Sequence, residues 1–298
     1  MIEELNQPQN ILFIINPHSG IGKQKLMEEY IGKNLDRRLF TPTICYTERK
    51  GHAYDLAAEA QKNGIPIIAI AGGDGTVNEA GRALMGTNSS LLIIPTGSGN
   101  GIANHYKIPD NAEAILRSLE HWKTIKTDVG MINEFPFFGF CGFGFDAHIA
   151  HEFAKLKSRG MAGYTRLVFR EFKKFIPQEI ELRCNGEVIR ENPFILSVAN
   201  VSEYGNGVKI DPDADTCDGE LGVCSIRKVN PFQLAVLFFK SRKGNISHSE
   251  FYRKRKGDSF EIISSQALKA HIDGEPWDFT DKHLKIRITD KQLQLLVP

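Results

Sequence analysis

The chain has 298 residues, of which 41% are hydrophobic and 24% charged, an ordinary balance for a globular protein with a sizeable core. Its 37 basic and 36 acidic residues leave a formal net charge of +1, which argues against binding nucleic acid over a broad basic surface. The polar N-terminus is unlike a signal peptide, and no apolar run approaches the ~18 residues of a membrane span. We therefore expect a cytoplasmic protein, and any membrane contact to be peripheral.

Apolar strands and helical segments alternate through the first half of the chain. The predicted strands are residues 11–16, 41–47, 65–71 and 90–95, and the predicted helices are residues 23–35, 52–64, 77–86 and 111–122. Short apolar strands separated by helices indicate a parallel α/β sheet with helices on both faces. Such sheets bind ligands at the carboxyl ends of their strands.

After about residue 128 the pattern changes to short alternating runs that indicate antiparallel strands, interrupted by one helical stretch at 162–175. Turn pairs such as Asn185-Gly186 and Asp218-Gly219 separate these runs. We therefore predict an α/β domain over residues 1–128 and a β-rich, sandwich-like domain over 129–298, whose last strand could return to the first domain. The five cysteines form no CxxC pair, so we expect free thiols.

Four turns that contain glycine follow the predicted strands of the first half: NPHSGIGK, TERKGHA, GGDGT and PTGSGNG. Glycine lets backbone N–H groups approach an anion closely, and the helix that follows adds a favourable dipole. Several such turns along one sheet edge predict a phosphate or nucleotide site. GGDGTV lacks the third glycine of the Rossmann pattern, and GIGKQ lacks the spacing and hydroxyl of the Walker loop, so the phosphate cradle is of another kind.

These motifs, in this order, resemble the lipid kinase family that includes the bacterial diacylglycerol kinases and the sphingosine kinases. The resemblance continues through DVG at Asp128, GFGFDA at Asp146, KLKSRGMAGY, YGNGVKIDPDADTCDGELGV and HIDGEPW, and so covers nearly the whole chain. GGDGT alone would also fit the NAD kinases and phosphofructokinases. The resemblance implies a kinase that uses ATP and Mg²⁺ to phosphorylate a lipid hydroxyl, in a cleft between a nucleotide domain and a lipid domain.

Asp74 stands between glycines at the end of a predicted strand, where a carboxylate would repel a bound triphosphate unless a cation intervened. We therefore expect Asp74 to act through Mg²⁺, directly or through water. The alternative is a helix N-cap, a role that Asp74 and Thr76 both suit.

The resemblance also implies a set of nucleotide contacts. They are Asn16, Pro17, His18, Ser19, Gly20, Thr47, Gly72, Gly73, Asp74, Gly75, Thr76, Asn78, Glu79, Gly97, Ser98, Gly99 and Asn100. Lys23 is either a phosphate contact or a solvated helix residue, and Glu79 could simply cap a helix. Gly101 stands where many diacylglycerol kinases have an aspartate, which leaves the precise lipid open.

Glu275, in HIDGEPW, is the candidate general base, because transfer to a lipid hydroxyl needs a carboxylate close to the proton that leaves. The alternative for this segment is a plain hairpin turn, since Asp-Gly is a strong turn signal. Asp273 could orient the site or bind metal, and the resemblance places Asp128 in an acidic cluster between the domains.

Three further features of the second half each have two readings. The carboxylates of Asp213, Asp215 and Asp218 suit a structural Mg²⁺ by resemblance, although Cys217 stands where relatives have an aspartate and is a poor ligand for this ion. His148 and His151 are spaced either as a zinc pair or as ordinary surface histidines. The basic run 253–256 is either a solvated face or a contact for anionic headgroups.

The phenylalanines near residue 140 could line a lipid site or belong to the core: Phe135, Phe137, Phe138, Phe143 and Phe145. Two other functions stay open. One is a kinase of a soluble substrate, as NAD kinase is. The other is a nucleotide-binding regulator without catalysis, which the departures at Gly101 and Cys217 would permit.

Overall fold

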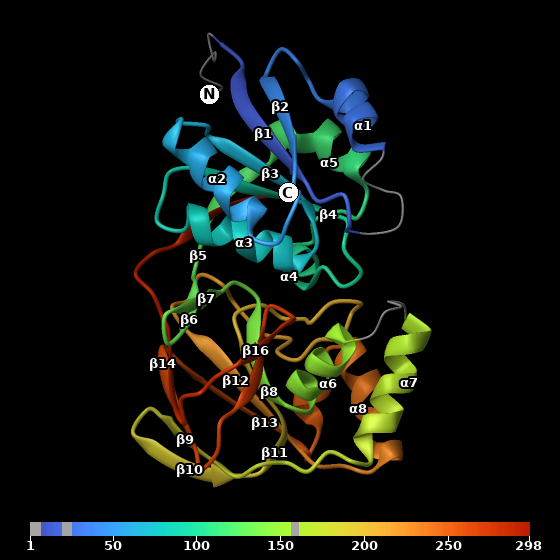
Figure 1. The fold of residues 1–298 in the computed structure, drawn as a ribbon, viewed down its shortest axis with the longest axis vertical. Coiled ribbons are helices and arrows are strands. Elements are labelled where there is room, and N and C mark those ends of the chain that lie inside the picture. Colours follow the sequence, from blue (N-terminus) through green and yellow to red (C-terminus); the bar gives the residue numbers. More distant parts are fainter. Residues whose placement is uncertain (1–6, 20–25, 156–160) are drawn as a thin grey trace. The chain divides into compact units, whose positions relative to one another are not determined.

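The computed structural model describes residues 7–19, 26–155 and 161–298. The chain divides into two compact units (Figure 1). The first unit comprises Met1–Val129 together with Asp290–Pro298, and the second comprises Gly130–Thr289. The end of the chain therefore belongs to the same unit as its beginning.

The first unit is built on a six-stranded sheet in the order β2-β1-β3-β4-β18-β5. Its strands are β1 Gln9–Ile15, β2 Phe40–Tyr46, β3 Ile67–Gly72, β4 Ser90–Pro95, β5 Lys123–Thr127 and β18 Leu293–Val297. Every neighbouring pair is parallel except β18 and β5, which run antiparallel. All residues of β3 and β4 are buried, as expected for strands covered by helices on both faces.

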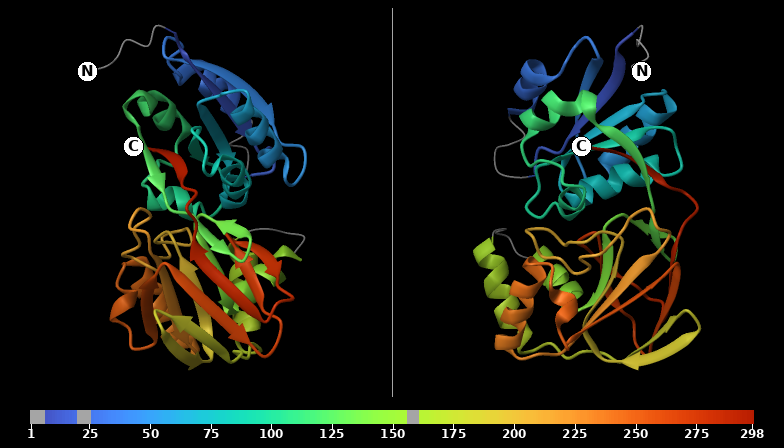
Figure 2. Two further views of the ribbon diagram at one scale, coloured as in Figure 1. Left: turned by 90° about the vertical axis from the view of Figure 1, so that its left-hand side faces the viewer. Right: turned by 180° about the vertical axis from the view of Figure 1, so that it is seen from behind.

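The helices of the first unit cover both faces of this sheet (Figure 2). They are α1 Met27–Asn34, α2 His52–Lys62, α3 Asp74–Leu84, α4 Gly101–His105 and α5 Ala112–Ser118. The chain leaves β1 toward β2 on one side and later returns past β1 to β3 on the other. Because such crossovers are right-handed, α1 lies on the opposite face from α2 and α3. The carboxyl ends of β1 and β3 thus flank a topological switch point, where sheets of this kind bind ligands.

The second unit contains two six-stranded antiparallel sheets, in the orders β10-β9-β14-β17-β6-β7 and β13-β12-β11-β8-β15-β16. The strands of the first are β6 Gly130–Ile132, β7 Phe135–Phe137, β9 Ile180–Cys184, β10 Glu187–Glu191, β14 Ser259–Ser264 and β17 His283–Ile288. Those of the second are β8 Phe140–Gly144, β11 Pro193–Ala199, β12 Leu221–Arg227, β13 Tyr252–Gly257, β15 Lys269–Ile272 and β16 Glu275–Asp278. One core draws residues from both sheets, including Phe137, Leu182 and Val198. These observations confirm the predicted α/β domain followed by a β-sandwich.

The prediction of a single helix in the second half was wrong, because the described residues there form three α-helices. They are α6 Phe145–Ala154, α7 Met161–Phe172 and α8 Pro231–Arg242. Helix α8 is apolar around most of its circumference, so the period of a half-buried helix is absent from its sequence. Its start was nevertheless encoded, since Asn230 and Gln233 form a capping box with Pro231 at the first helical position.

Candidate functional site

Polar side chains join the ends of β1, β3 and β4 at the switch point. The Asn16 side-chain amide donates to the Thr76 hydroxyl at 2.9 Å, which links the end of β1 to helix α3. The Ser19 hydroxyl lies 2.6 Å from that of Thr96 and donates to the Asn16 carbonyl at 2.9 Å. Three segments far apart in the sequence are thereby fixed to one another at the edge where the sequence predicts phosphate binding.

Two glycines allow the turns after β3 and β4 to pass within van der Waals contact. A Cβ on Gly97 would lie 2.6 Å from the Gly73 Cα and 2.7 Å from the Asn100 side-chain oxygen. A Cβ on Gly72 would likewise lie 2.6 Å from the Cβ of Thr76. These contacts leave no room for side chains at Gly72 and Gly97, so glycine is required for the close approach of the two turns.

We expect Gly97→Ala to lower the free energy of unfolding by about 2 kcal/mol, because a methyl group must force the two backbones apart. Gly32→Ala is the matched control, since nothing lies within 4 Å of a Cβ at that position in helix α1. It should raise stability slightly, by about 0.5–1 kcal/mol, through the better helix propensity of alanine. Urea denaturation of the two variants measures both effects. Equal stability of the Gly97→Ala and wild-type proteins would contradict the close approach.

Asp74 begins helix α3, and its carboxylate reaches the beginning of another helix. One oxygen accepts the Gly101 N–H at 3.1 Å and the other accepts the Ile102 N–H at 3.3 Å, at the start of α4. The predicted N-cap role therefore exists, but for α4 instead of α3, whose N-cap residue Gly73 has no side chain. A carboxylate oxygen keeps further lone pairs after accepting one N–H, so capping leaves Asp74 able to meet a cation.

Asn100 directly precedes the two residues whose N–H groups bind Asp74. It adopts a left-handed backbone conformation with a φ of 55°, and its amide nitrogen donates to the Gly97 carbonyl at 2.9 Å. Its side-chain oxygen is buried and has no hydrogen-bond partner among the described residues. A buried oxygen in this state is costly unless a ligand, water or ion meets it. The oxygens of Asp74 and Asn100 are ligands of the type that Mg²⁺ prefers.

Glu79 also caps a neighbouring helix. Its two carboxylate oxygens accept the N–H groups of Gly51 at 2.8 Å and Ala53 at 3.3 Å, at the start of α2. Thr47 is buried at the end of β2, where its N–H donates to the Ile15 carbonyl at 2.9 Å. The TERKGHA turn is thereby anchored to the same sheet edge as the other glycine turns.

The other predicted nucleotide contacts lie in the turns already described or fall outside the described residues. Pro17 and His18 follow β1, and the His18 N–H donates to the Asn16 side-chain oxygen at 2.9 Å. Four more predicted contacts lie in the first turns of α3 or in the turn after β4: Gly75, Asn78, Ser98 and Gly99. Gly20 and Lys23 lie outside the described residues.

Asp128 lies away from the glycine turns within the first unit. Leu295 of β18 pairs with Leu91 near the start of β4, and Leu293 of β18 pairs with Thr127 at the end of β5. The buried Asp128 therefore follows the end of the sheet at which β4 and β18 begin, whereas the glycine turns lie where the parallel strands end. The first unit does not bring it to the switch point, and its place in an acidic cluster stays a prediction.

Glu275 is the first residue of β16 and is exposed next to a two-residue hairpin turn. Ile272 and Glu275 face each other across the hairpin, and the two turn residues, Asp273 and Gly274, have φ angles of 46° and 84°. Positive φ at both positions defines the tight turn for which Asp-Gly is favoured. The hairpin reading and the catalytic reading of this motif are thus compatible, since the turn presents the carboxylate to solvent.

Asp273 fixes this hairpin to the start of the neighbouring strand β8. Its buried carboxylate accepts three backbone N–H groups, from Phe138 at 3.0 Å, Gly139 at 2.8 Å and Phe140 at 2.9 Å. The Asp273 N–H donates to the Phe140 carbonyl at 2.9 Å. Charge-assisted hydrogen bonds of this kind are stronger than neutral ones, so Asp273 holds Glu275 in place from the adjacent turn.

A second buried cluster lies beside the same hairpin and was not predicted as a site. His271 of β15 contacts the Asp146 carboxylate at 3.2 Å, and Tyr204 donates its hydroxyl to the same oxygen at 3.1 Å. Burial raises the pKa of Tyr204 well above its usual value, so it stays a neutral donor. Gly142 makes room, since a Cβ there would lie 2.2 Å from the histidine ring. The signal was present in GFGFDA and HIDGEPW, but spacing alone does not pair residues 125 positions apart.

The loop after residue 210 carries the three predicted ligands of a structural Mg²⁺. Asp213 and Asp215 are exposed, while Asp218 accepts from Lys256 at 2.9 Å. The neighbouring, fully buried Asp211 pairs with Lys254. No group of three or more metal-ligating side chains that could hold an ion occurs among the described residues. Of the three predicted ligands only Asp218 is thus bound by a described lysine, and a structural Mg²⁺ at Asp213, Asp215 and Asp218 stays a prediction.

His148 and His151 serve separate contacts and do not form a zinc pair. His148 meets Glu171 of α7 at 3.1 Å, and His151 meets the Ala270 carbonyl at 3.0 Å. In the basic run 253–256, Lys254 and Lys256 both bind carboxylates of the loop. The histidines thus take their structural reading, and contact of the basic run with headgroups stays a prediction.

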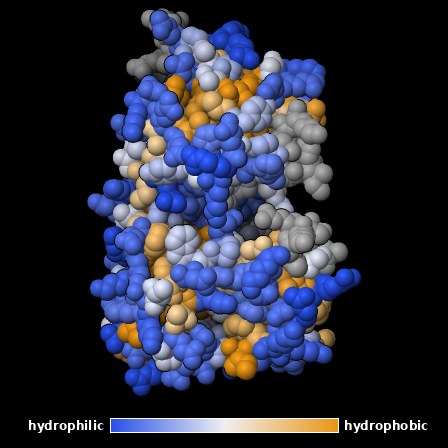
Figure 3. Space-filling view, in the orientation of Figure 1, coloured by the Kyte–Doolittle hydropathy of each residue, from blue (hydrophilic) through white to orange (hydrophobic). Residues whose placement is uncertain are grey.

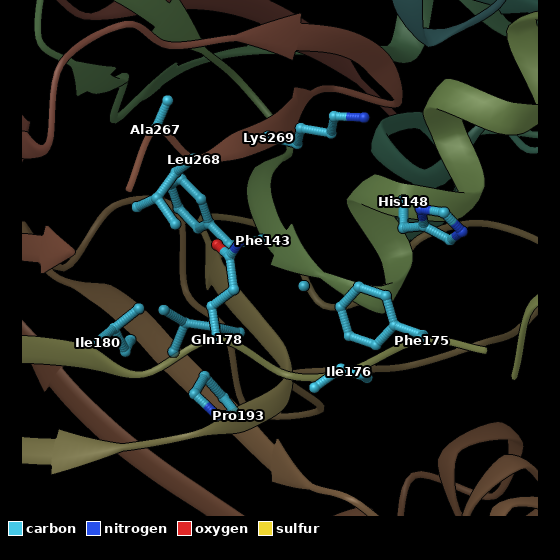
Figure 4. A pocket seen from close by; sticks show the side chains of 12 residues that line it. Phe143, His148, Phe175, Ile176, Gln178, Ile180, Pro193, Ala267, Leu268 and Lys269 are labelled. Carbon is cyan, nitrogen blue, oxygen red and sulfur yellow. The ribbon is translucent and has the colours of Figure 1, made fainter. Parts of the chain in front are cut away.

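The second unit contains an apolar cavity of about 150 Å³ at the rim of its sandwich. Figure 4 shows Phe143, Phe175 and Leu268 around it, with His148 and Lys269 on one side. A cavity of this size holds a benzene-sized apolar group, which matches part of a hydrocarbon chain. Of the five phenylalanines predicted for a lipid wall, Phe143 lines the cavity, whereas Phe137, Phe138 and Phe145 are buried and Phe135 is half-buried.

Comparison with known proteins agrees with this geometry. Residues 10–132 match the family described as the diacylglycerol kinase catalytic domain, and residues 139–297 match the YegS C-terminal NAD kinase beta sandwich-like domain. The chain is 24% identical to a diacylglycerol kinase of Bacillus subtilis, covering 92% of this chain and 94% of that protein. It is 27% identical to a diacylglycerol kinase of Staphylococcus haemolyticus, covering 88% of this chain and 81% of that protein.

A solved structure shares the fold. The crystal structure of a diacylglycerol kinase from Bacillus anthracis superposes with a TM-score of 0.74 at 19% sequence identity, covering 97% of both chains. The two matched families together span the chain from the first strand of the α/β unit to the last strand. The chain therefore belongs to the lipid kinase family that joins a diacylglycerol kinase catalytic domain to a YegS-type C-terminal domain, and it is a lipid kinase.

Proposed function

We propose that this protein transfers the γ-phosphate of ATP, as its Mg²⁺ complex, to a hydroxyl of diacylglycerol, a sphingoid base or a related lipid. The observation that carries the nucleotide half is the turn pair after β3 and β4, where the backbones of Gly73 and Gly97 pass so closely that Gly97 has no room for a side chain. Family membership supports the lipid as acceptor.

The first unit would hold the nucleotide at its switch point. Backbone groups of the glycine turns would bind the phosphates, and the N-terminus of α3 would add its dipole. When bound, Mg²⁺ would neutralise phosphate charge and hold the phosphates in position for transfer. Asp74 and Asn100 supply oxygens suited to that ion, with Asp74 held in place by the N–H groups of α4.

Glu275 would accept the proton of the lipid hydroxyl as that oxygen attacks phosphorus. Its exposure at a hairpin turn makes it accessible to a substrate, and the three hydrogen bonds to Asp273 limit the movement of the turn. A positioned carboxylate of this kind accelerates proton transfer by about 10²–10⁴-fold. The apolar cavity beside Phe143 would take part of the lipid chain.

A phosphotransfer screen tests this proposal directly. Purified protein is incubated with labelled ATP and either a fractionated lipid extract or NAD, with Mg²⁺ or with EDTA, and products are identified by mass spectrometry. We expect label in a lipid product only when Mg²⁺ is present. Label in NAD would instead indicate a kinase of a soluble substrate. Tight ATP binding without transfer to any acceptor would indicate a regulator that has lost catalysis.

A further inference from the structure

Helix α8 exposes a continuous apolar stripe on the second unit. Phe232, Val236 and Phe239 are spaced four and three residues apart, so they lie along one side of the helix. They are 77%, 40% and 64% exposed, respectively. Leu237 and Ser241 are buried on the opposite side. The helix is therefore anchored by one side and presents aromatic side chains to solvent from the other.

This stripe is a larger apolar feature than a singly exposed side chain. On the face shown in Figure 3 most of the surface is hydrophilic. Phe238, on the flank of α8, is a further exposed aromatic side chain at 44%. Exposed apolar patches that are rimmed by polar residues mark interaction sites.

Basic residues border the stripe. Lys240 and Arg242 lie in the last turn of α8, and the exposed Lys243 follows on the same side as Phe232 and Phe239. The bulky ring of Phe239 and the charge of Lys243 thus face solvent together. An apolar stripe with cations beside it is the pattern of helices that lie in the interface of anionic membranes.

Helix α7 also exposes an aromatic side chain. It lies beside α8 (Figures 1 and 2), and Leu234 of α8 packs on the buried cluster that contains Leu167 and Phe172 of α7. Its exposed residues include Phe169, with Arg166 and Arg170 on either side in the sequence. An exposed aromatic side chain with cations beside it therefore occurs on both helices.

The segment after α7 connects this surface to the apolar cavity. Ile176 lines the cavity and is at the same time 78% exposed, next to Phe175, whose carbonyl accepts from Lys228 just before α8. A bilayer on the α7–α8 surface would therefore lie close to the mouth of the proposed chain site. None of the described helices is long and apolar enough to span a bilayer.

We propose that the exposed face of α8, continued by α7, docks the protein on bilayers that contain anionic lipids. The proposal rests on the proposed lipid acceptor, since a membrane-embedded substrate must be reached from a surface. The run 253–256, the other basic segment considered for headgroup contact, has its two lysines engaged by Asp211 and Asp218. Phenyl rings would enter the interface while the basic side chains meet anionic headgroups.

Vesicle sedimentation tests this proposal. The full chain is incubated with vesicles of phosphatidylcholine alone or mixed with phosphatidylglycerol. We expect binding to the mixed vesicles that weakens as salt is raised. The double variant Phe232→Ser/Phe239→Ser should lose about tenfold or more in partitioning, because two aromatic rings no longer leave water. Lys243→Gln should lose about fivefold on anionic vesicles only.

The matched control is Val188→Ser, since Val188 is 59% exposed on the distant strand β10 of the same unit. It should bind vesicles as the wild type does, and circular dichroism should show all variants folded. Wild-type protein that ignores anionic vesicles, or a double variant that binds equally well, overturns the proposal. So does a dimer by light scattering that the double variant converts to monomer, which would assign the stripe to a second copy.

An activity assay separates this inference from the proposed function. Phosphorylation of a water-dispersed short-chain diacylglycerol, without vesicle binding, would contradict the docking surface and leave the lipid kinase reaction intact. Vesicle binding that requires Phe232 and Phe239, without phosphorylation of any lipid, would contradict the reaction and leave the surface intact. With both correct, the double variant should lose activity on vesicles but keep it on the short-chain substrate.

Discussion

Replacing Asp74 with asparagine should lower kcat by about a thousandfold or more while the protein stays folded. Asparagine has nearly the same shape and keeps one oxygen to accept an N–H from the start of α4, so most of the capping should survive. The substitution removes the negative charge of the Asp74 carboxylate, which we propose interacts with Mg²⁺. Loss of charge stabilisation in phosphoryl transfer lowers the rate by factors of this size. Steady-state kinetics and thermal unfolding measure the two effects separately.

A second capped helix provides the control for Asp74. Asn111 accepts the Glu113 N–H at 2.9 Å at the start of α5 in the same unit. Asn111→Ala should cost about 1 kcal/mol of stability through the lost cap, with kcat unchanged. If Asp74→Asn behaved like Asn111→Ala, losing a little stability and no activity, Asp74 would be a capping residue only.

Glu275→Gln should lower kcat by about 10²–10⁴-fold with little change in stability. The side chain is exposed at the start of β16, and glutamine preserves its size, so the hairpin should form as before. The proton acceptor is lost, which affects the chemical step and leaves ATP binding unchanged. Single-turnover measurements with labelled ATP, together with an ATP titration, distinguish these two quantities.

The neighbouring carboxylate gives the contrasting result. Asp273→Ala removes the acceptor of three buried N–H groups and should lower the free energy of unfolding by about 3 kcal/mol or more. Wild-type turnover of the Glu275→Gln variant would show that Glu275 is not the general base. A variant that lost stability as Asp273→Ala does would show that Glu275 is a structural residue of the turn.

Local patterns in the sequence predicted strands β1 to β4 and helices α1, α2, α3 and α5 of the first unit, but not strand β5 or the short helix α4. The buried strands carry apolar runs, and the turns after them carry glycine because the backbone approaches another backbone or has positive φ. The Asp-Gly hairpin before Glu275 was also predictable from the sequence, since both turn residues have positive φ and Asp-Gly is favoured in such turns.

Helix α8 could not be read from hydrophobic periodicity. Its buried side packs on the sandwich, while its other side carries Phe232 and Phe239 in solvent, so apolar residues surround the axis and the 3.6-residue period vanishes. The exposed aromatic residues serve the proposed contact with the membrane, whereas the buried ones pack in the core. Only the tertiary structure shows which apolar residues of α8 are buried and which are exposed.

The sequence also did not predict the hydrogen-bond and ion-pair partners of the carboxylates. Asp74 and Glu79 each looked suited to capping a helix, and both do cap one, but each caps a helix other than the one it belongs to. The acidic loop likewise suggested a metal ion, whereas Lys254 and Lys256 reach its carboxylates from a strand about 40 residues later.

The sequence by itself determined the order of elements, the glycine turns at the ends of the parallel strands and the family resemblance, because these depend on residues that are close along the chain. Tertiary structure alone decided which charges neutralise one another, which helices are capped from outside, how His271 meets Asp146, and which apolar residues stay in solvent. Those properties depend on segments that folding brings together from distances of tens to more than a hundred residues, and no local pattern records such a pairing.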